Sequence, residues 1–166
     1  MPVRAQSDSV QWMRERWEAH GEPHPAQFAA MASVLRTSVL MTDELDRVLK
    51  ACGLSRTGYL VMITLQMSDE ATRPLGQLGK ALLIHPTTVT MVIDQLEKSA
   101  LVRRQPHPTD RRTVLAQLTP KGHAAAERAT AALAEIGFGL DGITDSAADR
   151  LVADLRKIRQ GLQDFG

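Results

Sequence analysis

The sequence contains little cysteine, few aromatic residues and almost no excess charge. Its 166 residues include one cysteine, Cys52, and 4% aromatic residues, and its formal net charge is +1. A single cysteine excludes an intramolecular disulfide and a cysteine-rich zinc site, and it is typical of a reducing compartment. Because aromatic residues are scarce, aliphatic side chains and methionine must fill the core. Because the charges nearly balance, any attraction for a polyanion must come from a local cluster.

Long apolar runs are also lacking. No uninterrupted apolar stretch approaches the length that spans a membrane, and the first ten residues, MPVRAQSDSV, lack the apolar segment of a signal peptide. We therefore expect a cytoplasmic protein that does not enter a membrane. The five histidines are scattered without helical metal-binding spacing, and there is no nucleophile–base arrangement or glycine-rich phosphate loop. The sequence predicts no catalysis, no metal and no cofactor.

Helical spacing dominates what the chain does contain. A short helix capped by Ser7 or Ser9 is expected first, and a long helix from about Gln27 to Ala51 should follow it and end before Gly53. Two short strands, LVRRQ and TVLAQL, are expected on either side of the loop PHPTDRR. Five further helices are predicted after Ser55, from Pro74, from Pro86, from Pro120 to about Phe138, and from Thr144 onward.

Apolar side chains at spacings of three and four predict the buried faces of these helices. One core does not need apolar stripes on so many terminal helices, so we expect a symmetric homodimer to bury the terminal ones. The predicted faces are Phe28, Met31, Leu35, Val39 and Leu49; Tyr59, Leu60, Ile63 and Met67; Val89, Ile93, Leu96 and Ala100; and Leu151, Leu155, Ile158, Leu162 and Phe165.

Two helices joined by a tight turn and followed by a hairpin are typical of a winged helix-turn-helix. The expected fold class is mainly α with a small β-hairpin wing, flanked by N- and C-terminal dimerisation helices. The expected parts are an extension with an extra short helix over 1–26, a dimerisation helix over 27–54, a winged helix-turn-helix lobe over 55–118, and C-terminal dimerisation helices over 119–166.

Double-stranded DNA is the partner that this pattern favours. Small polar side chains near the start of the second helix let its backbone approach a major groove, and an exposed arginine of the wing can enter a narrow minor groove. The clustered positive charge of the wing therefore has a local partner, and Asp110 is expected to orient a neighbouring arginine. The candidate DNA-binding residues are Thr87, Thr88, Thr90, Met91, Lys98, Arg103, Asp110, Arg111 and Arg112.

The stretch HPTTVTMVIDQLEKSALVRRQPHPTDRRTVLAQLTPKG resembles the core of the MarR family of bacterial transcriptional regulators. The resemblance covers about Gln27 to Phe165. It implies a homodimer that binds a roughly palindromic operator, usually as a repressor released by a small ligand or by oxidation. It also implies that Arg112 reaches the minor groove and that Asp110 supports the wing. The matching residues are Leu96, Glu97, Lys98, Leu101, Val102, Arg103, Asp110, Arg111, Arg112, Leu118, Thr119, Pro120, Lys121 and Gly122.

The resemblance also implies an effector pocket between the dimer helices and the DNA-binding lobe. An apolar or aromatic molecule is the expected ligand, although ordinary core packing is the alternative for each apolar lining residue. The candidate lining residues are Trp17, Met41, Tyr59, Met62, Gln66 and Arg104.

Two other functions stay open at this stage. Cys52 could serve as a thiol-based redox switch, but it lies at the C-terminal end of the long helix, where the helix dipole disfavours a thiolate. The chain could also be a protein-interaction module that has lost DNA binding, and the arginine-bearing wing argues against this.

Overall fold

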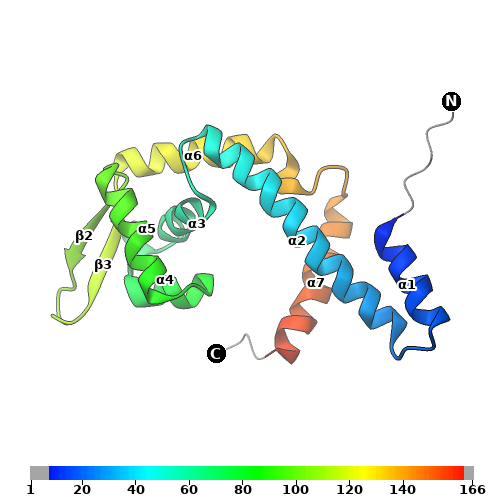
Figure 1. Cartoon of the computed structure of the whole chain (residues 1–166). Coiled ribbons are helices and arrows are strands. Elements are labelled where there is room, and N and C mark those ends of the chain that lie inside the picture. The colour runs from blue at the N-terminus through cyan, green and yellow to red at the C-terminus, as the bar shows by residue number, and fades with distance from the viewer. Residues whose placement is uncertain (1–7, 163–166) are drawn as a thin grey trace. The chain divides into compact units, whose positions relative to one another are not determined.

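The computed structural model describes residues 8–162, which contain seven α-helices and one three-stranded sheet (Figure 1). The expected fold class is confirmed. The chain divides into two compact units, the first ending at Arg47 and the second beginning at Val48. The elements are α1 (Ser9–Ala19), α2 (Pro25–Ala51), α3 (Arg56–Gln66), η1 (Asp69–Ala71), β1 (Thr72–Pro74), α4 (Leu75–Leu82), α5 (Pro86–Lys98), β2 (Val102–Pro106), β3 (Val114–Leu118), α6 (Pro120–Ala134), η2 (Gly137–Gly139) and α7 (Asp145–Gly161).

In the first unit, a ring stack joins α1 to the beginning of α2. Trp17 lies on Phe28 with ring centroids 3.9 Å apart and planes 10° from parallel. The indole N–H of Trp17 donates to the carbonyl oxygen of Pro23 at 2.8 Å. This bond ties the linker to α1, because its acceptor is a linker carbonyl oxygen. It also satisfies the one polar atom of a large apolar ring.

In the second unit, α3, α4 and α5 pack against a sheet whose strand order is β1-β3-β2, and all neighbours are antiparallel. β2 and β3 form the expected hairpin, with Val102 opposite Leu118 and Pro106 opposite Val114. β1, three residues long, was not predicted. It pairs with β3 on the other edge, and this holds the segment before α4 against the base of the hairpin.

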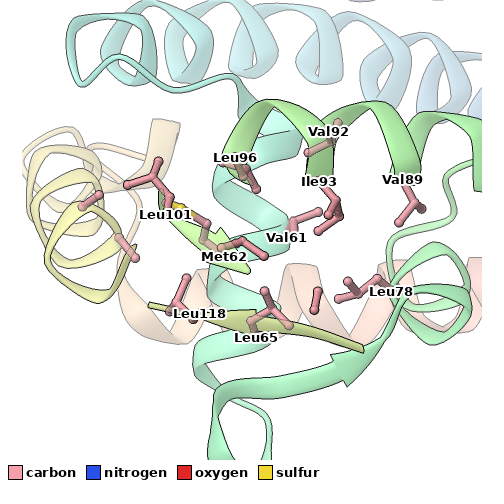
Figure 2. Packing of buried hydrophobic residues seen from close by; sticks show 14 residues of the cluster. Val61, Met62, Leu65, Leu78, Val89, Val92, Ile93, Leu96, Leu101 and Leu118 are labelled. Carbon is pink, nitrogen blue, oxygen red and sulfur yellow. The ribbon is translucent and has the colours of Figure 1, made fainter. Parts of the chain in front are cut away.

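A single apolar cluster joins these helices to the sheet (Figure 2). Its members point toward one another from α3, α4, α5, β2, β3 and α6, and burial of their side chains is the main term that stabilises the unit. The buried cluster consists of Val61, Met62, Leu65, Leu78, Val89, Val92, Ile93, Leu96, Leu101, Val102, Ala116, Leu118, Ala125 and Ala126.

The predicted faces of two helices were partly wrong. In α3, Leu60 is 41% exposed and Met67, just after the helix, is 75% exposed, whereas the interior residues are Tyr59, Val61, Met62 and Leu65. This helix is apolar on nearly every side, so spacing alone could not choose the stripe.

After α5, Ala100 is exposed rather than inward. Its φ of 56° is left-handed and lies outside the helix, so it no longer follows the helical spacing. Val92 belongs to the buried face instead and is 8% exposed.

Several helix boundaries also differ from the prediction. Asp8 caps α1, because its carboxylate accepts from the amide of Val10 at 2.9 Å; Ser9 is the first residue of the helix, and Ser7 lies outside the described residues. The long helix α2 begins at Pro25 rather than Gln27.

At the other end of the lobe, Pro74 precedes α4 as its cap instead of starting it. The helix α6 ends at Ala134, before Phe138, whose φ of 54° is incompatible with a continuing helix.

Apolar side chains of α2 and α7 remain exposed in the isolated chain. The predicted stripe of α7 is exposed at Leu151, Ile158 and Leu162 and half-buried at Leu155, and Phe165 lies outside the described residues. Among the described residues, no single helix is long and apolar enough to cross a membrane, although α2 and α3, bent against each other, pass that test as a pair. The exposed large apolar residues of α2 are Met31, Val34, Leu35, Val39 and Leu40.

Candidate DNA-binding surface

The helix α5 presents a small, polar and exposed face beside the wing. Pro86 occupies its first turn, and the Nδ1 atom of His85 caps it by accepting from the amide of Thr87 at 3.3 Å. The apolar side of α5 is buried in the core, so the opposite side is fixed toward solvent. Met91 is 58% exposed in the middle of this face. The predicted residues Thr87, Thr88, Thr90, Met91 and Lys98 are all exposed.

Close backbone packing sets the turn between α4 and α5. A Cβ atom added to Gly79 would lie 3.1 Å from the carbonyl oxygen of Ile84 and 3.3 Å from a methyl carbon of Val89. Leu83 takes a left-handed conformation with φ 52° to end α4. Gly79 therefore lets the backbone of α4 approach the turn and the start of α5 more closely than most side chains allow, and a Cβ atom at this position would require its neighbours to move by a few tenths of an ångström.

Arg104 ties the base of the wing to α5. Its guanidinium lies 2.6 Å from Asp94 and 2.5 Å from Glu97, and its backbone N–H donates to Glu97 at 2.9 Å. The backbone hydrogen bond first, and then the guanidinium, lower the pKa of the Glu97 carboxyl below its ordinary value. Arg104 was predicted to line an effector pocket, and this stays a prediction; in this structure its guanidinium pairs with Asp94 and Glu97 of α5.

The wing loop is shaped by Asp110. Its carboxylate accepts from the backbone N–H of Arg112 at 3.0 Å and from the hydroxyl of Thr113 at 2.5 Å. The Thr113 hydroxyl first, and then the Arg112 amide, lower the pKa of the Asp110 carboxyl. Asp110 was expected to orient an arginine side chain; its carboxylate holds the backbone amide of Arg112, as in an Asx turn, and the side-chain hydroxyl of Thr113.

The tip of the wing therefore presents Arg111 and Arg112 on a constrained backbone, and both residues are exposed. The structure gathers the exposed face of α5 and these arginines in one lobe. Arg103 differs, because strand alternation turns it to the opposite face of the sheet from Arg104. There its Nε atom donates to Gln117 at 2.7 Å.

The candidate effector residues fall in both units. Trp17 and Met41 belong to the first unit, and Trp17 is engaged by its stack on Phe28. Met62 is fully buried in the core of the lobe. Tyr59 is also buried, and its hydroxyl lies 3.0 Å from that of Thr130 on α6.

Gln66 is half-buried, and its Oε1 atom has no hydrogen-bond partner among the described residues. It shares α3 with Tyr59 and Met62, whereas Arg104 lies on β2 and faces α5.

An open hollow of about 300 Å³ lies in the first unit between α1 and the beginning of α2. Aromatic rings line it, and Arg16 lies over the ring of Trp12 with its guanidinium carbon 6.0 Å from the ring centroid. This hollow was not predicted from sequence, although two tryptophans and an arginine within one short helix are its signal. Its lining residues are Trp12, Met13, Arg16, Trp17, His20, Glu22 and Phe28.

Within residues 8–162, no group of three or more His, Cys, Asp or Glu side chains is close enough together to hold a metal ion. Cys52, the residue of the redox alternative, is a free and exposed thiol.

Comparisons with known proteins agree with this geometry. Residues 54–114 match the model of the MarR family. The HTH-type transcriptional regulator PecS of Dickeya dadantii is 34% identical over 125 residues, which cover 74% of this chain and 72% of that protein. The structure of Sco5413, a MarR family regulator from Streptomyces coelicolor, has a TM-score of 0.76 and 33% identity and covers 84% of this chain and 97% of that one. Sco3205 of the same organism, solved in complex with DNA, has a TM-score of 0.74 and 25% identity, with coverage of 80% and 88%.

Proposed function

The chain belongs to the MarR family and is a DNA-binding transcriptional regulator rather than an enzyme. From this premise we propose that it is a homodimeric repressor of a palindromic operator and that a small aromatic ligand releases it. The observation that carries the proposal is the pairing of a small-residue face on α5 with a constrained arginine-bearing wing in one lobe.

In this proposal, α5 enters the major groove and the wing enters the adjacent minor groove. Thr87, Thr88 and Thr90 lie near the helix N-terminus, where short side chains and the positive end of the helix dipole suit base edges and phosphates. Met91 is placed to contact a thymine methyl group. Arg112 reads the narrow minor groove, and Arg111 and Lys98 neutralise phosphates.

Homodimerisation is supported by the exposed apolar side chains of α2 and α7. Leu35 and Val39 are each 60% exposed, and Val152 is 61% exposed, in a chain considered alone. Exposed apolar surface of this kind on each helix is typical of a protein interface, and a second copy would place two lobes on one palindromic site. The full chain should elute as a dimer, and a stable monomer at micromolar concentration would contradict this part of the proposal.

The hollow beside α1 supports an aromatic effector. Trp12, Trp17 and Phe28 offer ring faces, and Arg16 offers a positive charge at the rim, which together suit a flat aromatic acid. A ligand that binds the free dimer better than the DNA-bound one must raise its melting temperature and weaken its DNA binding by linked amounts.

The test is a binding assay with the DNA upstream of the protein's own gene, against a scrambled duplex of the same composition. We expect salt-dependent binding that prefers the upstream sequence, and release by aromatic acids that also raise the melting temperature. Arg16→Ala should weaken the ligand response and leave DNA binding unchanged. Equal affinity for both duplexes at every salt concentration would contradict the function.

A further inference from the structure

A histidine ring lies inside the wing loop and accepts hydrogen bonds from its backbone. The Nδ1 atom of His107 lies 3.3 Å from the amide nitrogen of Thr109 and 3.2 Å from that of Asp110. The hydroxyl oxygen of Thr109 lies 3.4 Å from the same atom. His107 is half-buried, and its own amide donates to the carbonyl oxygen of Thr113 at 3.2 Å across the hairpin.

These contacts require one form of the imidazole. An Nδ1 atom can accept an amide hydrogen only through its lone pair, so the ring must be neutral with its hydrogen on Nε2. In the imidazolium both nitrogens carry hydrogen, and the Nδ1–H would face the N–H groups of Thr109 and Asp110. Protonation would therefore replace two attractive contacts with two repulsive ones.

We propose that His107 is a positioning residue of the wing, and that its unprotonated ring holds the loop in the shape with which Arg112 distinguishes DNA sequences. The proposal rests on the DNA-binding function proposed above. Asp110 and His107 hold the loop on both sides of Arg111, because Asp110 accepts from Arg112 and Thr113 and His107 accepts from Thr109 and Asp110. Loss of the His107 contacts frees the backbone that leads to the arginines.

Three charged groups lie around His107. The Asp110 carboxylate, on the same loop, interacts with His107 electrostatically. Arg112 and Lys80, the latter on α4, line a second hollow, between α4 and the wing, together with His107. Protonation of His107 would have two consequences that can be measured separately. The added positive charge strengthens binding to every duplex, whereas loss of the loop hydrogen bonds lowers the ratio of operator affinity to scrambled-duplex affinity.

Two substitutions isolate the acceptor. In His107→Asn, the side-chain oxygen can occupy the place of Nδ1 and accept the same amides at any pH, as asparagine does in Asx turns. In His107→Phe, a ring of similar size remains but no acceptor does. His24→Asn is the matched control, because it removes an exposed histidine from the linker between α1 and α2, at a left-handed φ of 54° that asparagine tolerates.

The measurement is the ratio of operator affinity to scrambled-duplex affinity at pH 8 and pH 5.5. At pH 8 we expect the parent, His24→Asn and His107→Asn to discriminate equally, and His107→Phe to lose about fivefold, the size of one lost cap. At pH 5.5 the parent should fall to the level of His107→Phe while its salt slope grows, and His107→Asn should keep its ratio. A parent ratio that does not change with pH, or a parent and His107→Asn that fall together, overturns the proposal.

A second measurement separates this inference from the proposed function, because it needs no DNA. Nitrogen-15 spectra of histidine-labelled full-length protein report which ring nitrogen carries hydrogen, and the His107 signals are those missing from His107→Asn. We expect an unprotonated Nδ1 and a protonated Nε2 at pH 8. A hydrogen on Nδ1 at pH 8 overturns the inference. If the parent binds no duplex but shows the expected tautomer, the DNA-binding function fails while the role of His107 in the loop stands.

Discussion

Substituting alanine for Gly122 should damage the joint between the wing and α6. A Cβ atom added to Gly122 would lie 2.1 Å from the carbonyl oxygen of Leu101 and 2.7 Å from a methyl carbon of Leu118. The contact cannot be relieved by turning a side chain, because the nearest atom belongs to the backbone at the start of the hairpin. The same carbonyl oxygen accepts from the amide of Thr119 at 3.0 Å and from its hydroxyl at 3.1 Å.

The cost follows from these contacts. Forcing a methyl group into a well-packed site costs about 1–3 kcal/mol. Moving the Leu101 carbonyl away also breaks its two hydrogen bonds from Thr119, each worth about 1 kcal/mol. The free energy of unfolding of Gly122→Ala should therefore fall by about 3–5 kcal/mol. For a chain of this size, each kcal/mol lowers the melting temperature by about 2–4 °C, so we expect a drop of at least about 6 °C.

The assay is thermal unfolding by circular dichroism at one protomer concentration, since dimerisation makes the melting temperature depend on concentration. Gly76→Ala is the matched control: Gly76 lies in α4, and nothing lies within 4 Å of its added Cβ atom. That variant should be unchanged or more stable by up to about 1 kcal/mol, because alanine favours a helix. A Gly122→Ala protein that melts within about 2 °C of the parent would refute the reasoning, because that difference corresponds to only about 1 kcal/mol or less.

Other substitutions test the interface itself. Arg112→Ala should cost on the order of 1–3 kcal/mol in operator binding and flatten the preference for A·T pairs at the flank of each half-site; unchanged affinity of the folded variant would exclude a wing contact. Lys98→Ala should weaken operator and scrambled duplexes alike and lower the salt slope by about one unit, and a sequence-dependent loss would contradict a phosphate contact. Arg104→Gln should destabilise the lobe by about 1 kcal/mol near neutral pH. Because the folded-state pKa of Glu97 is lowered, the stability that Arg104 confers is present above the ordinary pKa of a glutamate and is lost as pH falls through the lowered value. The difference in melting temperature between the parent and Arg104→Gln should therefore disappear in acid. A difference that grows in acid would refute the stabilising role of the Arg104–Glu97 pair. Cys52→Ser should leave operator affinity and any response to peroxide unchanged, and loss of a peroxide-driven release would favour the redox alternative.

The hairpin and the starts of α3 and α6 could be predicted from sequence because they depend on neighbours along the chain. Ser55 and Thr119 cap their helices as expected, accepting from the amides of Gly58 and Gly122 at 3.1 and 3.0 Å. Pro120 occupies the first turn of α6. Caps and tight turns act over three or four residues, so their signals are complete within a short stretch of sequence.

Long-range pairing decided what local patterns could not. Thr72–Pro74 is too short to show strand periodicity, and it becomes a strand only because β3 offers its free edge. The inward face of α3 was ambiguous because the helix is apolar on most sides, and the sheet and α5 select Met62 and Leu65.

The partners of Arg104, Asp110 and His107 could likewise be identified only from the tertiary structure. Asp94 and Glu97 precede Arg104 by ten and seven residues, and the turn after α5 brings all three together. In the wing loop, the Asp110 carboxylate and the Nδ1 atom of His107 accept hydrogen bonds from backbone amides. The amides that they bind cannot be assigned from composition or spacing. The sequence by itself determined which segment collects the positive charge that we propose contacts DNA. The folded lobe decided which side chains remain free to do so, because a side chain's partners depend on which elements pack against it.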